Sequence, residues 1–168
     1  NQGNVFNIPL ASDPAFMQSV IQKNCDKRTY SSDISFVGSL YTEKTAYDKL
    51  QDLPDNWSGY LNGIMAAQQK IYGYYFIDEL ITQPLIDTFK SHMPGYYTPP
   101  NAPFLTDSAI ISQLYIGNKI TSLERIALAK LLAANYSLDL YTGSDTSNLT
   151  EIHNCGLAKT MTEMPLIF

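Results

Sequence analysis

Cysteine is scarce in this chain of 168 residues, since Cys25 and Cys155 are its two cysteines and lie far apart. No C-x-x-C pair occurs, so the usual spacing of zinc ligands is absent and no disulfide can be inferred. Neither His92 nor His153 has an acidic or thiol partner at a spacing typical of metal ligands. A nucleophile pair of His153 and Cys155 would need both side chains to meet in space, which their spacing does not promise. We therefore expect free thiols and no metal site.

Charge is also scarce, because charged residues make up 16% of the chain. Eleven Lys and Arg oppose sixteen Asp and Glu, which leaves a net charge of -5. The basic residues form no cluster, so we expect no binding to nucleic acid, whose phosphate backbone this balance repels. No run approaches the roughly 20 apolar residues of a membrane-spanning helix, so no membrane span is expected. The hydrophobic share of 45% is nevertheless enough for about one globular domain with its own core.

Tyrosine is the one residue type in excess, with twelve copies. A tyrosine ring has an apolar body and a polar tip, which suits half-buried surfaces and sugar-facing clefts. The clustered tyrosines could present a sugar-stacking surface, although packing between helices is the favoured interpretation. These residues are Tyr72, Tyr74, Tyr75, Tyr96 and Tyr97.

Two short segments have the pattern of strands that end in small-residue loops. Residues 33–37 (DISFV) favour β-structure and break at Gly38 and Ser39. Residues 137–141 (SLDLY) alternate in polarity and lead into a second such loop at residues 142–145 (TGSD). We expect both loops to be places where a ligand can bind.

A helix is predicted just before the second strand. Thr121 and Glu124 have the spacing of a capping box, which predicts a helix from Ser122 to about Ala134, closed by Asn135 in the left-handed conformation. A helix between two strands of one sheet makes a parallel unit, so the predicted class is α/β. Ligands of open parallel sheets bind outside the carboxyl ends of the strands, where both loops would lie. Neither loop matches a dinucleotide or P-loop signature, so a phosphate site and plain turns remain alternatives.

The first strand and this helix are separated by about 80 residues, far more than an ordinary loop between a strand and a helix. Several prolines divide the intervening residues into helical pieces, so we predict a helical insertion at residues 43–118. The α/β part then consists of residues 31–42 and 119–168. Residues 1–30 are expected to be an extended linker with a short helix from Asp13, and the ends of the chain suggest a piece of a longer protein.

Within the insertion, Asp55 is expected to cap a helix that ends near Gly73. A second helix should run from Phe76 towards Phe89, with a break near Pro84. Asp107 is expected to cap a further short helix. The first of these helices has a predicted apolar stripe formed by Tyr60, Ile64, Ala67 and Ile71.

Four segments together resemble a known family. They are residues 32–41 (SDISFVGSLY), 118–125 (NKITSLER), 138–146 (LDLYTGSDT) and 159–168 (KTMTEMPLIF). In this order they resemble the CgeB-type, spore-protein-like glycosyltransferase family. The helical insertion resembles the domain of unknown function that accompanies group 1 glycosyltransferases in bacteria.

The resemblance implies a cytoplasmic bacterial protein of GT-B architecture, in which two Rossmann-like halves face each other and no metal is essential. This chain would be part of the donor-binding half of a glycosyltransferase that transfers a sugar from a nucleotide-sugar to an unknown acceptor, with no further cofactor. Gly38 and Ser39 would approach the donor diphosphate, and the second loop would contact the nucleoside. The candidate binding residues are Gly38, Ser39, Thr142, Gly143, Ser144 and Asp145. Glu163 is a further acid-base candidate, and Arg125 is either a phosphate clamp or a solvated or ion-paired side chain.

Another function class remains open. The helical insertion could be a non-catalytic interaction module that recruits an acceptor protein, a glycan or a partner chain. As a third possibility, the exposed edges of a two-strand parallel core could pair with a second copy of the chain. A broad apolar patch on the outside of the insertion would favour this alternative.

Overall fold

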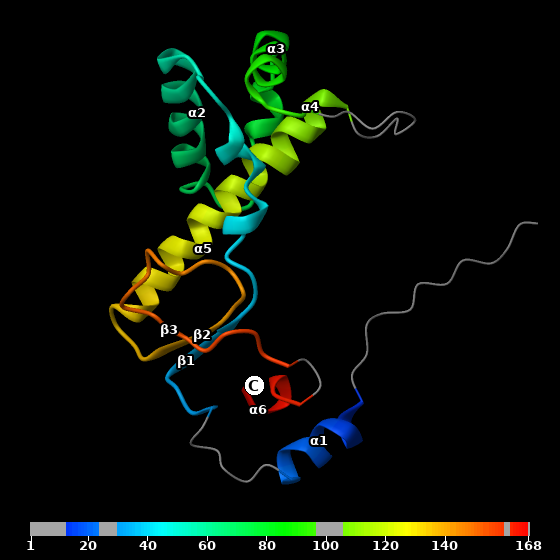
Figure 1. The fold of residues 1–168 in the computed structure, drawn as a ribbon, viewed down its shortest axis with the longest axis vertical. Coiled ribbons are helices and arrows are strands. Elements are labelled where there is room, and N and C mark those ends of the chain that lie inside the picture. Colours follow the sequence, from blue (N-terminus) through cyan, green and yellow to red (C-terminus); the bar gives the residue numbers. More distant parts are fainter. Residues whose placement is uncertain (1–12, 24–29, 97–105, 160–161, 168) are drawn as a thin grey trace, which may run out of the picture.

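The computed structural model describes residues 13–23, 30–96, 106–159 and 162–167. Two regions lie at opposite ends of one long helical rod (Figure 1). The rod comprises α4 (Asp107–Ala109), the π-helical segment η5 (Ile110–Gly117) and α5 (Asn118–Ala133). Its first part packs with the helical insertion and its last part packs on a small sheet. Among the described residues, no helix is long and apolar enough to cross a membrane.

The sheet has three parallel strands in the order β1 (Ile34–Val37), β2 (Leu138–Tyr141) and β3 (His153–Asn154). This confirms the two predicted strands, their parallel pairing and the α/β class, whereas β3 was not predicted. The register places Ser35 opposite Asp139, and Asp139 opposite His153. Because side chains alternate along a strand, these three residues share one face of the sheet.

The other face of the sheet packs against α5. Leu138 and Leu140 of β2 are 4% and 0% exposed, and they contact Ala129 of α5. We call this group the sheet core; its buried members are Leu40, Ala129, Leu138, Leu140, Leu149 and Ile152. The apolar alternation of β2 therefore buries one face and leaves the opposite face to polar side chains.

The helical insertion has a larger core of its own. It contains α2 (Asp55–Gln68), η4 (Ile77–Leu80) and α3 (Gln83–His92), preceded by the short turns η2 (Thr42–Lys44) and η3 (Ala46–Lys49). We call its buried set the helical core: Leu61, Met65, Ile77, Leu85, Ile86, Phe89, Met93, Ile111, Ile116 and Ile120. The predicted break near Pro84 is confirmed, because η4 ends at Leu80 and α3 begins at Gln83.

The predicted apolar stripe of α2 is wrong for Tyr60, Ala67 and Ile71, which are exposed, whereas Ile64 packs against the helical core. Leu61, Met65 and Gln68 face the core instead. Both sets have the helical spacing, so periodicity alone could not choose between them. Gln68 can occupy the buried face because its amide donates to the carbonyl of Tyr74 at 2.9 Å and accepts from the amide of Phe76 at 3.0 Å. The helix was predicted to end near Gly73, but α2 ends at Gln68.

The predicted capping box is not used, and no new helix begins at Ser122. Gly117 has helical angles, and the Thr121 hydroxyl donates back to the carbonyl of Gly117 at 2.9 Å. Thr106, not Asp107, caps the start of the rod by accepting from the Ala109 amide. The rod continues because Ile116 and Ile120 are buried in the helical core and Ala129 in the sheet core, so both cores stabilise it. Asn135 closes it with a side-chain bond to the Leu131 carbonyl, without left-handed geometry.

The chain ends are only partly described. The predicted helix after Asp13 is confirmed as α1 (Pro14–Lys23), because the Asp13 carboxylate accepts from the amides of Ala15 and Phe16 at 3.0 and 3.1 Å. The predicted linker in residues 1–12 and Cys25 lie outside the described residues, as does Tyr97. A short helix, α6 (Met164–Ile167), is the last described element and contacts α1.

Candidate functional site

The two small-residue loops meet at the carboxyl ends of β1 and β2, where they line one pocket of about 340 Å³. We call it the loop pocket. It brings together four of the six predicted binding residues. Its lining residues are Val37, Gly38, Ser39, Glu43, Tyr141, Gly143, Ser144, Leu157, Ala158 and Met164.

Glu43 is the charged side chain of the loop pocket. Its carboxylate accepts from the Ser39 hydroxyl at 2.6 Å and from the Ser144 hydroxyl at 2.8 Å. The hydrogen bond from Ser39 is the largest cause that lowers the pKa of Glu43 from its usual 4.5 to about 2, and the bond from Ser144 contributes. Glu43 is therefore a carboxylate throughout the physiological range, and both loops are tied to it.

Four backbone amides around the pocket bind within the protein. The amide of Gly38 donates to the Tyr141 carbonyl at 3.1 Å, which extends the pairing of β1 with β2. The amides of Leu40 and Tyr41 donate to the hydroxyls of Ser144 and Ser39 at 2.9 and 2.8 Å. Ser144 donates its own amide to the Thr142 hydroxyl at 3.1 Å. None of these four bonds uses the amide of Ser39 or of Gly143.

Thr142 and Asp145 do not line the loop pocket. Thr142 is 2% exposed, and its hydroxyl holds the turn through the Ser144 amide. Asp145 accepts from the amide and hydroxyl of Ser147 at 2.9 and 3.1 Å, and these bonds lower its pKa. Asp145 is thus the turn-forming residue that such a loop often contains.

Gly143 lies close to Leu157, whose exposed side chain would have to shift if a larger residue stood at position 143. A Cβ atom there would lie 3.1 Å from a methyl carbon of Leu157, on the wall of the pocket. Gly38 has no atom as close as this to a Cβ built on it. Glycine is favoured there because of its φ of +154°, which residues with side chains rarely adopt.

Arg125 is half-buried and bonded within the protein rather than freely solvated. Its guanidinium donates to the Ser39 carbonyl at 2.5 Å and lies 4.8 Å from the centre of the Tyr41 ring. It thereby links the rod to the first loop, where Tyr41 has a left-handed φ of 64°. Glu163 accepts from the Lys159 amide at 2.8 Å and so caps a local turn.

Sequence reasoning missed Glu43. It follows the first loop at a distance of four residues from Ser39, a spacing that one turn of chain can close. That spacing is a weak signal, because an exposed acidic residue after a loop is common. Its partner Ser144 lies 101 residues away and is found only in the folded protein.

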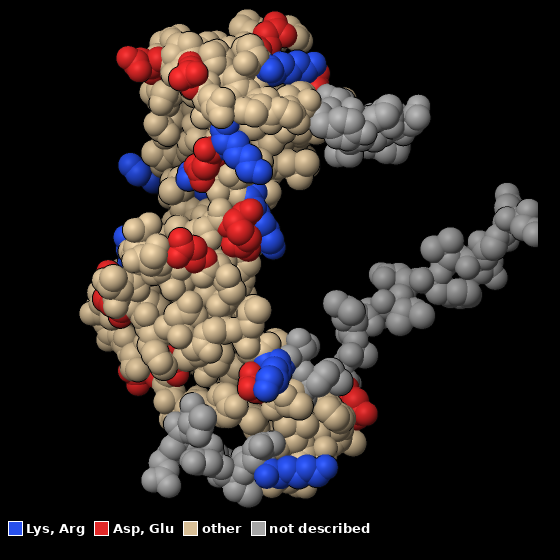
Figure 2. Space-filling model, in the orientation of Figure 1, with Lys and Arg blue, Asp and Glu red and all other residues tan. Residues whose placement is uncertain are grey.

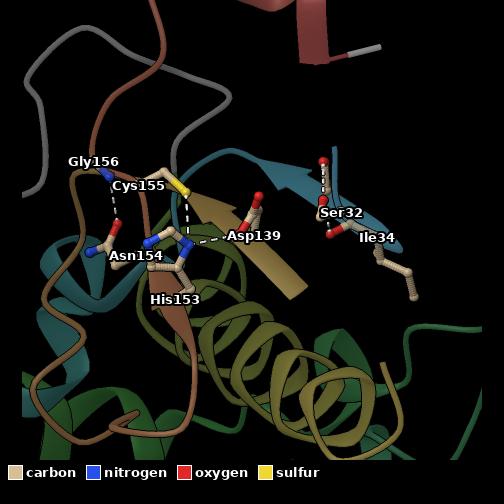
Figure 3. Close-up of polar contacts among 8 residues, drawn as sticks. Ser32, Ile34, Asp139, His153, Asn154, Cys155 and Gly156 are labelled. Carbon is tan, nitrogen blue, oxygen red and sulfur yellow. Dashed lines mark hydrogen bonds and ion pairs between the residues drawn. The ribbon is translucent and has the colours of Figure 1, made fainter. Parts of the chain in front are cut away.

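A second polar group lies on the open face of the sheet (Figure 3). His153 Nδ1 is 2.8 Å from an Asp139 carboxylate oxygen and 3.5 Å from Cys155 Sγ. We call these residues the Asp-His-Cys cluster. The spacing along the sequence predicts no acidic or thiol partner for His153. This prediction is wrong for the folded protein, because the register of β2 and β3 places Asp139 next to His153.

The Asp-His-Cys cluster does not have the geometry of a catalytic triad. In a triad, the nucleophile and the carboxylate contact different nitrogens of the imidazole ring. Here both contact Nδ1. Burial, with a contribution from Asp139, also raises the pKa of the Cys155 thiol, whereas a nucleophilic cysteine needs a lowered one. Tyr141 adjoins the thiol, and burial raises the pKa of its phenol to about 12.

The clustered tyrosines divide between packing and exposure. Tyr75 is half-buried and its hydroxyl donates to the Ser112 carbonyl at 2.6 Å. Tyr72 is 97% exposed and Tyr74 is 55% exposed. All three line a cavity of about 590 Å³ between the end of α2 and the rod, which we call the tyrosine cavity. The packing interpretation thus holds for Tyr75 and is wrong for Tyr72.

Charges are mixed on the surface. Figure 2 shows Lys and Arg interspersed with Asp and Glu on the face in view, with no basic patch. Three of the described lysines are paired: Lys90 with Asp107, Lys119 with Asp48 and Lys159 with Glu163.

Comparison with known proteins found no matching family model, no matching curated protein and no matching solved structure.

Proposed function

We propose that this chain is the donor-binding part of a glycosyltransferase-like protein and that the loop pocket binds a nucleotide-sugar. The observation that carries the proposal is the meeting of two small-residue loops at the carboxyl edge of a parallel sheet, around one pocket. Ligands of open parallel sheets bind at this edge. The resemblance to CgeB-type glycosyltransferases adds the Rossmann-like, GT-B architecture to the proposal, together with a cytoplasmic site of action.

Glu43 determines how a nucleotide-sugar would lie in the pocket. An ionised carboxylate repels the diphosphate and accepts hydrogen bonds from hydroxyl groups. The hydroxyls of the transferred sugar therefore face Glu43, and the diphosphate lies towards the amides of Ser39 and Gly143. In catalysis those amides would stabilise the charge on the departing diphosphate, which is the main contribution this part of the protein would make.

The proposal is tested by titrating the chain with UDP, GDP and dTDP, and with a UDP-sugar, by calorimetry or ligand-observed NMR. We expect at least one of these ligands to bind and Ser144→Ala to weaken it. Glu43→Gln should weaken the nucleotide-sugar more than the free nucleotide, because only the former brings the sugar hydroxyls. Gly63→Ala is the matched control, since no atom lies within 4 Å of a Cβ built there. Absence of binding by all four ligands would refute the proposal.

A second candidate function is supported by the tyrosine cavity. Ile71, Tyr72 and Tyr74 are exposed side by side along the chain, and exposed aromatic side chains are typical of binding surfaces. The helical insertion would then recruit an acceptor glycan or protein. Saturation-transfer NMR with simple glycans distinguishes the two functions, because Tyr72→Ser should abolish this binding and leave nucleotide binding unchanged.

A further inference from the structure

We propose that Asp139, His153 and Cys155 form a zinc-binding site on the open face of the sheet. Its protein ligands would be a carboxylate oxygen of Asp139, Nδ1 of His153 and the thiolate of Cys155. The site is separate from the loop pocket, whose lining includes none of these three residues.

The three donor atoms converge on one point. All of them lie within 4.8 Å of one another, and Nδ1 of His153 is 3.5 Å from Sγ of Cys155. Zinc-ligand bonds of 2.0 to 2.3 Å in a tetrahedron place the ligand atoms about 3.3–3.7 Å apart. The nitrogen and sulfur already have this separation. The Asp139 oxygen lies 2.8 Å from Nδ1 and would need to move about half an ångström away from it. The hydrogen bond between Asp139 and His153 would then be replaced by one zinc bond to each residue.

The backbone holds the donors in this position. Asp139 and His153 are direct partners in the ladder of β2 with β3. Cys155 follows His153 by two residues, and its amide continues the ladder to the Leu140 carbonyl at 2.9 Å, so its side chain returns to the same face. Gly156 then turns the chain with a φ of +78°, and its amide donates to the Asn154 side chain at 2.9 Å (Figure 3). Two ligands thus come from regular strands and the third from a closed turn.

The donor types indicate which ion fits. Thiolate and imidazole ligands suit zinc, whereas magnesium and calcium require a shell of oxygen atoms. Three protein ligands leave the fourth position of a tetrahedron for water or a ligand, as in catalytic zinc sites. The side chain of His153 is 75% exposed, so an ion can reach the site from solvent.

Zinc binding releases one net proton to solvent. The Cys155 thiol releases its proton to solvent as the sulfur-zinc bond forms. On neutral His153, the proton that Nδ1 shares with Asp139 leaves while Nε2 takes one from water, so the ring stays neutral. No oxidant or reductant takes part.

The test uses the chain of residues 1–168 with a non-thiol reductant present. Zn²⁺ alone is titrated by calorimetry, and Co²⁺ alone by absorption spectroscopy, where a thiolate ligand gives a near-ultraviolet charge-transfer band. We expect a single equivalent of either ion to bind and the band to appear. Cys155→Ser should abolish the band. Asp139→Asn and His153→Gln should each weaken Zn²⁺ binding by at least about tenfold.

Two matched controls keep the result specific. Cys25→Ser and His92→Gln remove the other cysteine and the other histidine, and both should leave ion binding unchanged. Circular dichroism of each variant separates a lost ligand from a lost fold. Absence of Zn²⁺ binding, or a cobalt band that survives in Cys155→Ser and disappears in Cys25→Ser, would overturn the proposal.

Discussion

The helical and sheet regions use their apolar residues in different ways. The helical core has ten buried residues, drawn from two helices, a 3-10 turn and the rod. The sheet core has six, and they cover one face of a three-stranded sheet. The opposite face carries Asp139 and His153, and the loop pocket lies at its edge. The region with less apolar burial therefore carries the concentrated polar chemistry, because polar groups need a face that packing does not occupy.

The rod joins the two regions, since Ile116 and Ile120 belong to the helical core and Ala129 to the sheet core. Because an α-helix loses its hydrogen bonds cooperatively, we infer that the two cores unfold in one transition. Single substitutions in each region can test this comparison.

The largest effect is expected for Phe89→Ala. Phe89 is 0% exposed and its ring lies 6.3 and 5.9 Å from the rings of Tyr47 and Tyr115. Loss of a buried phenylalanine costs about 3–5 kcal/mol of the free energy of unfolding. Urea unfolding followed by Trp57 fluorescence measures it, since Trp57 packs against the helical core. A loss below about 1 kcal/mol would mean that this core is not the stabilising one.

The next effect is expected for Leu140→Ala, in the central strand. Leu140 is 0% exposed, so the change should cost about 2–5 kcal/mol. If the cores unfold together, the Trp57 transition must shift although Trp57 lies in the other region. The control Leu131→Ala removes a leucine that is 62% exposed and should leave stability within about 0.5 kcal/mol. An unchanged Trp57 transition in Leu140→Ala would show that the regions unfold independently.

Arg125→Ala tests the link between the rod and the first loop. A hydrogen bond from a charged group is worth about 1.5–3 kcal/mol, so we expect a loss of this order in urea unfolding. Arg125→Lys should restore only part of it, because an ammonium group lacks the planar surface that lies over Tyr41. Full restoration by lysine would contradict the role of that stacking.

A smaller effect is expected from acid. The pKa of Glu43 is lowered from 4.5 to about 2 in the folded protein, so its contribution to stability is present above about pH 4.5 and is lost as the pH falls towards 2. Urea midpoints measured across this range should fall, and Glu43→Gln should flatten the fall. The double variant Ser39→Ala with Ser144→Ala should also flatten it, by removing two donors to the carboxylate. An unchanged acid dependence in both variants would contradict the ties between Glu43 and the loops.

The smallest effect on stability is expected for Tyr72→Ser. Tyr72 is 97% exposed and so contributes little packing, and the free energy of unfolding should stay within about 0.5 kcal/mol of its original value. Thermal unfolding checks this. A larger loss would show that the tyrosine cavity is part of the helical core rather than an open surface.

Local sequence signals predicted the elements whose determinants lie close together in the chain. Asp13 and Pro14 predicted the start of α1, and the alternation of residues 137–141 predicted β2 and the loop after it. The capping box predicted a helix start that does not occur, because its residues lie inside a longer helix. A helix that already continues from Gly117 leaves no free amides at Ser122 for the box to cap.

The candidate sites were predictable only in part. Gly38, Ser39, Gly143 and Ser144 were identified from their positions after two strands, and they line one pocket. The ties to Glu43 and the Asp-His-Cys cluster were not found, because Ser144 is 101 residues from Glu43 and Asp139 is 14 residues from His153. The distance between two residues along the sequence does not show that they are neighbours in the fold. That depends on how the strands pair and on their register.

By itself, then, the sequence determined the class of the protein, the parallel pair of strands and the small-residue loops that follow them. These depend on side-chain polarity within a few neighbouring residues, which acts before any distant contact forms. The tertiary structure alone decided the continuous rod, the carboxylate between the loops and the Asp-His-Cys cluster. Each of these depends on packing or strand register, which brings together groups that the chain holds far apart.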